Sequence, residues 1–280
     1  MKTSSQKRNN AVSRVVIYAI LILITALMLI PFLWMLSASL KMNKDVFSFP
    51  IKWIPENPRW KNYVDIWTKI PLLTFVKNST KLTIIVTLLQ LFTSSFAAYA
   101  FAKMNFRGKN LLFLGYIATI AVPWQAYMVP QFMMMRAWHL NNTHLAIICL
   151  QAFSAFGVFL MKQFAEGIPG EILEAARIDG GGELKTFTTI VFPMIKPGVG
   201  ALAIFTFINT WNDYFMQLLM LTGTNVLSMP LGISKMMGEF GQDYGLLMAG
   251  AALASVPIII VFLVFQKYFT KGITMGAVKG

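Results

Sequence analysis

Cysteine and histidine are almost absent from this sequence. Cys149 is the only cysteine in 280 residues, so no disulfide can form within the chain. It lies in an apolar run, where a small buried residue is the simplest interpretation. The two histidines, His139 and His144, stand five residues apart without a neighbouring cysteine or carboxylate. That is a poor ligand set for zinc, and we predict no metal site.

Charge is also scarce. Charged residues make up 12% of the sequence and hydrophobic residues 56%, with a mean hydropathy of +0.62. Soluble domains carry about 25% charged residues, so this composition predicts a polytopic membrane protein. Acidic residues are the rarer sign, 11 against 24 Lys and Arg, which gives a net charge of +13. In a membrane protein this excess indicates basic segments beside anionic lipid, and we expect no nucleic-acid partner.

Signatures of catalysis are missing too. The sequence has no Gly-x-x-x-x-Gly-Lys-Ser/Thr pattern, the loop that cradles nucleotide phosphates. It has no internal repeat and no converging set of nucleophile and base. We therefore predict no catalytic residue and no ATP hydrolysis by this chain.

Six apolar runs predict an all-α fold with six transmembrane helices. The first run is too long for the apolar core of a signal peptide, which spans about 7–15 residues. We expect a transmembrane domain at 15–268 between cytoplasmic tails at 1–14 and 269–280. The expected spans cover about 15–40, 79–101, 111–133, 145–161, 198–221 and 245–265.

The distribution of basic residues supports cytoplasmic termini, with one exception. The expected cytoplasmic segments hold 14 Lys and Arg, and the later outer loops hold only Arg136 and Lys235. The first outer segment, residues 41–81, holds eight, against the positive-inside rule. The other loops and both tails agree with the orientation.

Polar residues form a stripe on the second span. Thr83, Thr87, Gln90 and Ser94 follow one another at helical spacing. Such a stripe indicates a face toward a water-filled path or toward another helix. Side chains that bond back to their own helix are an equally good explanation.

The fifth span carries a second polar face, with Asn209, Asn212 and Asp213 at helical spacing. An acid inside a membrane span is a functional hypothesis by default. The alternative is an interfacial acid that simply reaches water. The candidates for lining a polar pathway are Gln90, Asn209, Asn212 and Asp213.

A long charged loop, residues 166–197, separates the fourth and fifth spans. Glu171 and Glu174 suit the positive end of a helix dipole, and the glycines at 180–182 end that helix. A second amphipathic stretch with Leu184, Phe187 and Ile190 follows. We predict a short helix, a sharp bend and a second helix outside the membrane.

This loop resembles the cytoplasmic EAA loop of ABC importer permeases. The matching residues are Glu174, Ala175, Ala176, Asp179, Gly180, Phe187, Ile190, Pro193 and Pro197. One departure is Gly181, where the family most often has alanine. The resemblance implies a coupling helix that docks into a separate ATPase subunit through Glu174, Ala175, Ala176, Asp179 and Gly180. An ordinary surface helix–turn–helix is the alternative.

Trp211-Asn212-Asp213 and the chain end, residues 266–280, look like carbohydrate-uptake permeases of this family. They are most similar to the shorter, second membrane subunit of maltose transporters. The resemblance implies a bacterial or archaeal cytoplasmic membrane protein that binds no cofactor itself. It implies a second homologous permease, two copies of an ABC ATPase that hold ATP and magnesium, and an extracytoplasmic sugar-binding protein.

Two other interpretations stay open. The first is an EAA-loop permease for another solute, such as a polyamine or glycerol phosphate. The second is an independent secondary carrier or a membrane enzyme. Carriers usually show internal repeats and intramembrane charge pairs, neither of which is evident here.

Overall fold

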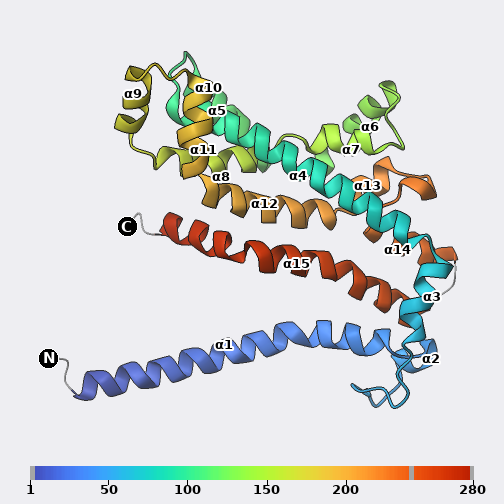
Figure 1. Ribbon diagram of the computed structural model, residues 1–280. Helices are drawn as coiled ribbons and strands as arrows, with labels where there is room; N and C mark the ends of the chain where they lie inside the picture. Colours follow the sequence, from blue (N-terminus) through green and yellow to red (C-terminus); the bar gives the residue numbers. More distant parts are fainter. Residues whose placement is uncertain (1–3, 240–242, 278–280) are drawn as a thin grey trace. The chain divides into compact units, whose positions relative to one another are not determined.

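Every regular element that the structure describes is a helix (Figure 1). The structure is a computed structural model that describes residues 4–239 and 243–277, so the predicted tails at 1–14 and 269–280 lie partly outside the described residues. The described chain forms two compact units. The first contains the residues up to Ile70 and Met236–Leu253, and the second contains Pro71–Lys235 and the residues from Ala254 onward. The predicted all-α membrane fold is confirmed.

The first unit contains one long apolar helix and a folded polar segment. Helix α1 (Ser4–Ser39) includes an apolar stretch, Ser13–Ser39, whose most apolar window has 0% of its residues buried. Helices α2 (Asn43–Val46) and α3 (Lys61–Lys69) follow. The Asn62 side chain donates to the main-chain oxygens of Ser39 at 2.8 Å and Lys41 at 3.0 Å. This amide fastens α3 to the end of α1.

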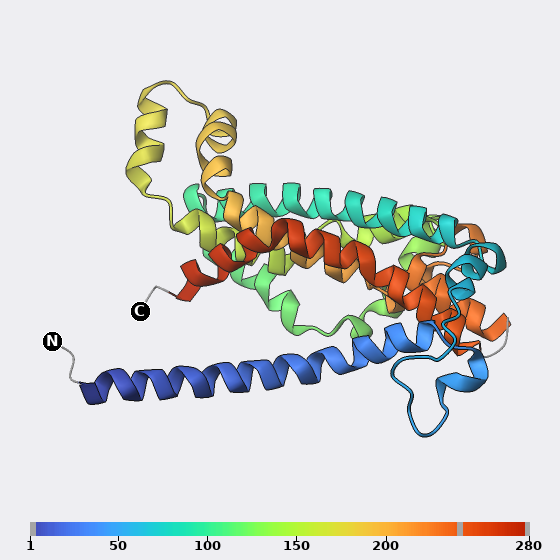
Figure 2. The same ribbon diagram turned by 60° about the horizontal axis from the view of Figure 1, so that its bottom comes forward.

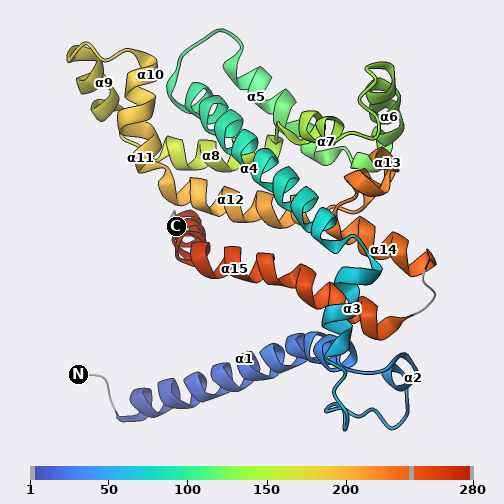
Figure 3. The ribbon, with the colours of Figure 1, turned by 45° about the vertical axis from the view of Figure 1, so that its right-hand side comes forward.

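The second unit is built around α4 (Leu72–Lys103). Helices α8 (Ala155–Glu166) and α12 (Lys196–Trp211) pack against it (Figure 3). The polar stripe of α4 faces this packing, because Thr83, Thr87 and Ser94 are buried. Gly157 of α8 permits the close approach, since a Cβ there would lie 2.4 Å from Ser94 Oγ. The stripe thus points toward other helices of the unit.

The number of membrane spans remains a prediction. Three described helices are long and apolar enough to cross a membrane: Ser13–Ser39, Leu72–Lys103 and Tyr244–Lys267, the last within α15 (Tyr244–Ala277). Two bent pairs raise the number to at most five. They join α7 (His144–Gln151) to α8 at 42°, and Glu183–Met194 to α12 at 76°.

The expected span at 111–133 is not one helix. It is divided into α5 (Lys109–Ala118), η1 (Thr119–Ala121), η2 (Trp124–Ala126) and α6 (Met128–Ala137). The chain is extended at Val122 and Pro123, because Pro123 cannot donate the bond that would continue the helix and favours an extended residue before it.

The expected span at 198–221 is not one helix. Helix α12 stops at Trp211, and α13 (Phe215–Met220) starts after a short break. Trp211 is held by its indole N–H, which donates to the main-chain oxygen of Ala254 at 3.0 Å. Asp213 therefore lies in a connection between helices instead of inside one.

Candidate functional site

The loop at 166–197 forms a helical hairpin that projects from the packed helices of the second unit (Figure 2). Helix α9 (Gly170–Ile178) is followed by a bend and by α10 (Glu183–Thr186), a π-helical turn, η3 (Phe187–Val191), and α11 (Phe192–Met194). Gly180 has φ +75°, a conformation that glycine adopts at little cost. Its N–H donates to Arg177 O, and Gly181 N–H donates to Ala176 O. The predicted bend is confirmed.

The structure shows which apolar side chains of the hairpin are buried. In α9, Leu173 is buried, whereas Ile172 and Ala175 are exposed. In the second arm, Phe187 and Val191 are buried and Leu184 is exposed. Leu173 and Phe187 join a core cluster with Met161, Leu202 and Tyr99. Sequence spacing alone did not identify which apolar residues this cluster would take.

The outward side of the hairpin carries the residues that the EAA resemblance selects. Glu174, Ala175, Asp179 and Gly180 are exposed, and Ala176 is half-buried. Beside them, the side chain of Ile178 is 86% exposed. A single exposed isoleucine is ordinary on a protein surface, so the candidate partner surface rests on the EAA resemblance.

A polar cluster that the sequence did not reveal ties the hairpin to α4. Glu183 accepts hydrogen bonds from Arg177 Nε at 3.2 Å and Nη2 at 3.0 Å, and from the hydroxyl of Tyr99. Tyr99 is buried in α4, and its ring lies 5.4 Å from that of Phe187. Lys103, four residues further along α4, donates to the main-chain oxygen of Ile168 at 2.5 Å. The end of α4 therefore holds the start of the hairpin and its bend. The only sign of this cluster in the sequence was that Arg177 and Glu183, which carry opposite charges, stand on either side of the glycines at 180–182.

A second candidate site is an open cavity of about 580 Å³ in the second unit. It brings together all four residues predicted for a polar pathway, namely Gln90, Asn209, Asn212 and Asp213. We call this cavity the polar pocket. Its other lining residues are Trp124, Gln151, Ser154, Phe205, Thr206, Ile208, Thr210, Tyr214, Phe215 and Met216.

Hydrogen bonds link the polar groups of the pocket in a chain. The Thr206 hydroxyl donates to Gln90 Oε1 at 3.0 Å, and Gln90 Nε2 donates to the main-chain oxygen of Gln151 at 2.7 Å. Gln151 Nε2 donates to Asp213 Oδ2 at 2.7 Å. The other carboxylate oxygen of Asp213 accepts from Met216 N–H at 3.3 Å, which orients the start of α13. The network thus joins α4, α7, α12 and α13.

The four predicted residues are not equivalent. Gln90 and Asp213 belong to the network, whereas the Asn209 amide donates to Phe205 O on its own helix at 2.7 Å, and Asn212 is exposed. Sequence analysis missed Gln151, which ends α7 after six apolar residues. Its Oε1 is buried and has no hydrogen-bond partner within the described chain. Neighbouring atoms cover this oxygen, so it is not exposed to the pocket.

The described residues offer hydrogen bonding and no ready metal site. Within residues 4–239 and 243–277, no group of three or more His, Cys, Asp or Glu side chains is placed to hold a metal. His144 Nε2 lies 2.8 Å from Val226 O, and it thereby connects two parts of the second unit.

Comparisons with known proteins match this architecture. Residues 90–275 match the family described as "Binding-protein-dependent transport system inner membrane component". The arabinooligosaccharides transport system permease protein AraQ of Bacillus subtilis is 31% identical over 273 residues, which are 96% of this chain and 97% of that protein. The melibiose/raffinose/stachyose import permease protein MelC of the same organism is 34% identical over 255 residues, covering 90% and 91% of the two chains.

A solved structure has the same fold. A chain of a bacterial ABC transporter involved in the import of the acidic polysaccharide alginate superposes with a TM-score of 0.82 at 23% identity, covering 96% of this chain and 99% of that one. The predicted resemblance to ABC importer permeases is confirmed, and its members are transport subunits instead of enzymes. The chain belongs to the family of binding-protein-dependent transport system inner membrane components, and it is a permease subunit of the bacterial cytoplasmic membrane.

Proposed function

We propose that this chain is one permease subunit of an importer that carries a sugar or oligosaccharide across the cytoplasmic membrane. The observation that carries the proposal is the polar pocket, which combines amides, one carboxylate and aromatic rings. Sugar hydroxyls both donate and accept, which suits the exposed Asn212 amide and the Asp213 carboxylate. Aromatic faces such as Trp124 and Phe215 suit the apolar faces of sugar rings. The names of AraQ and MelC, which refer to oligosaccharides, agree with this cargo.

The charges of the pocket argue against the other cargoes. Of the described residues that line it, none is Lys, Arg or His, so an anion such as glycerol phosphate would find no counter-ion. A polyamine would need several carboxylates, and Asp213 is the single acid in the lining. A neutral, hydroxyl-rich solute fits this composition best.

The hairpin supports a proposed coupling role. A separate ATPase subunit would cover Glu174, Ala175, Asp179 and Gly180, and the ATP and magnesium would be held there. ATP binding would then favour one state of the permease through a difference in affinity between two states. The full importer would also contain a second homologous permease and an extracytoplasmic sugar-binding protein.

Co-purification and uptake test the proposal. The chain is purified gently from its host, and an ATPase and a second permease are expected to come with it. Vesicles containing this complex and its binding protein are then offered labelled arabino-oligosaccharide, raffinose, spermidine or glycerol 3-phosphate. ATP-dependent uptake of a sugar alone is expected. Uptake by the purified chain without ATP, or uptake of spermidine alone, would favour the alternatives.

A further inference from the structure

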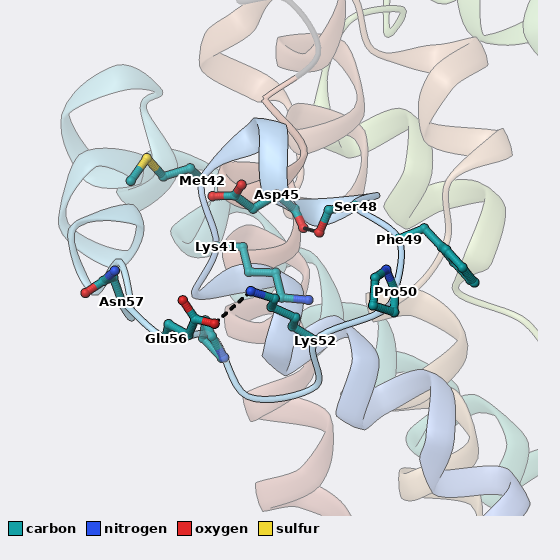
Figure 4. Close-up of a pocket in the computed structure, with 10 residues that line it drawn as sticks. Lys41, Met42, Asp45, Ser48, Phe49, Pro50, Lys52, Glu56 and Asn57 are labelled. Carbon is teal, nitrogen blue, oxygen red and sulfur yellow. Dashed lines mark hydrogen bonds and ion pairs between the residues drawn. The ribbon is translucent and has the colours of Figure 1, made fainter.

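A small pocket lies in the first unit, in the segment that follows α1 (Figure 4). Its volume is about 260 Å³, and we call it the Lys41 pocket. This segment belongs to the stretch whose eight basic residues contradict the positive-inside rule. The lining residues are Lys41, Met42, Asp45, Ser48, Phe49, Pro50, Lys52, Pro55, Glu56 and Asn57.

Of the two lysines that line the pocket, Lys41 is the one without an ion pair in the described part of the chain. The residue is only 4% exposed, and its ammonium has no hydrogen bond or ion pair within the described part of the chain. Lys52, by contrast, pairs with Glu56 at 2.7 Å. Figure 4 shows the Lys41 side chain running in toward Lys52. Its Nζ is not among the fully covered polar atoms that lack a partner, so the ammonium reaches the pocket and an anionic group can lie against it.

The position along the chain indicates where that anion comes from. Lys41 stands two residues beyond the apolar stretch Ser13–Ser39, whose 27 residues span about 40 Å as a helix. The hydrocarbon core is about 30 Å thick, so the end of such a helix reaches the headgroups. Phe49 is 93% exposed and Ile54 is 85% exposed, and Trp53 between them is also exposed. Apolar and aromatic side chains beside lysines are typical of the membrane interface. Phosphate is the anion present at that depth.

The balance of charges in the pocket indicates the kind of headgroup. Asp45 and Glu56 line it together with Lys41 and Lys52, so the charges of the side chains cancel. A purely anionic headgroup would meet two carboxylates as well as two lysines. A zwitterionic headgroup with a primary ammonium satisfies both signs, its phosphate on Lys41 and its ammonium near Asp45.

We propose that the Lys41 pocket binds the phosphoethanolamine headgroup of a membrane phospholipid, with the exposed Phe49 and Ile54 against its acyl chains. The bound lipid supplies the counter-ion of Lys41. The excess of basic residues in this segment then serves lipid recognition. This proposal requires α1 to span the membrane and is independent of the identity of the cargo.

Lipid retention tests the proposal on the full chain. The chain is placed in nanodiscs of equal parts phosphatidylethanolamine and phosphatidylglycerol, extracted into detergent and weighed by native mass spectrometry. The wild type is expected to retain phosphatidylethanolamine preferentially. K41Q is expected to retain it about tenfold less, the effect of losing one charge-assisted hydrogen bond. D45N is expected to shift retention toward phosphatidylglycerol.

Two controls keep the test decisive. Lys44 is exposed and lies outside the pocket lining, so K44Q should retain lipid like the wild type. K41R keeps the charge and should also retain lipid, which covers the case in which K41Q fails to fold. Soluble phosphoethanolamine should displace the lipid, whereas displacement by inorganic phosphate alone would make this a general phosphate site and overturn the assignment. Equal retention by K41Q and the wild type, or loss of binding-protein association in place of lipid, would also overturn it.

Discussion

The projecting hairpin and the polar pocket are held in different ways. The hairpin is clamped by side chains whose polar atoms bond to one another, with Glu183 accepting from Arg177 and Tyr99 at once. The polar pocket is lined by a chain of hydrogen bonds from Thr206 to Asp213, and the cavity beside this chain is open. A firmly attached element suits the transmission of force, and an open cavity with a polar lining suits a ligand that changes. Changes in the two regions should therefore give different defects.

The largest effect is expected from Gly180→Val. A β-branched residue at φ +75° is strained, and the bend that separates α9 from α10 would be lost. ATP-driven uptake should fall at least about tenfold while the chain still inserts in the membrane. Uptake is measured in vesicles, and membrane insertion is measured by immunoblotting of membranes. Gly182→Ala is the matched control, because Gly182 has φ −69° and open space around it. Normal transport by Gly180→Val would remove the hairpin from coupling.

The next largest effect is expected from Asp213→Asn. The amide keeps the shape but loses the charge that holds Gln151 and Met216. The KM for the sugar should rise about tenfold, the cost of one charge-assisted bond. The amount of sugar carried per ATP should stay constant, because the hairpin is intact. A change in that ratio with an unchanged KM would erase the distinction between the two regions.

Tyr99→Phe should lower the amount of sugar carried per ATP and leave the KM unchanged, and its effect should be smaller than that of Asp213→Asn. It removes only the hydroxyl that reaches Glu183 and leaves the ring against Phe187. A neutral donor to a charged acceptor contributes about 1.5–3 kcal/mol at most, and Glu183 is partly exposed, so we expect about a threefold drop in sugar carried per ATP. The KM should not move. Glu183→Gln should cost more than Tyr99→Phe, because it also removes the charge that pairs with Arg177. The double variant should cost less than the sum of the two single variants, since both weaken the bond between Tyr99 and Glu183.

The smallest effect is expected from Asn209→Ala. This residue lines the pocket, but its amide donates to Phe205 O on its own helix and to no other element. The KM should change less than about threefold, since the bond of a surface amide to its own helix adds little. A loss as large as that of Asp213→Asn would show that Asn209 touches the cargo directly.

Local chemistry made some features predictable. The bend at Gly180 follows from the backbone freedom of one residue, and the break at Pro123 follows from a missing N–H. The four pathway candidates meet in one pocket although α12 ends before two of them, because Asn212 and Asp213 directly follow the helix that carries Asn209.

Other features depend on contacts between distant residues. No glycine or proline at the end of α12 predicts that the helix stops at Trp211. Just after this end, Asp213 accepts hydrogen bonds from Met216 and from Gln151, and Gln151 is 62 residues away in the sequence. The burial of Leu173 in preference to Ile172 depends likewise on Phe187 and Met161, which sequence spacing does not bring together.

Helix α12 extends from the core cluster beneath the hairpin to the polar pocket, so its length determines how far a tilt at one end moves the other. Leu202 lies in the core cluster that anchors the hairpin, and Asn209 lines the pocket near the other end. The 16 residues of α12 measure about 24 Å along the axis. A tilt of about 5° at the hairpin end would displace the pocket end by about 2 Å, close to the reach of one hydrogen bond. With the cargo in the polar pocket, as proposed, a rigid rod of this length would turn a small rotation at the hairpin into the making or breaking of a contact with the cargo.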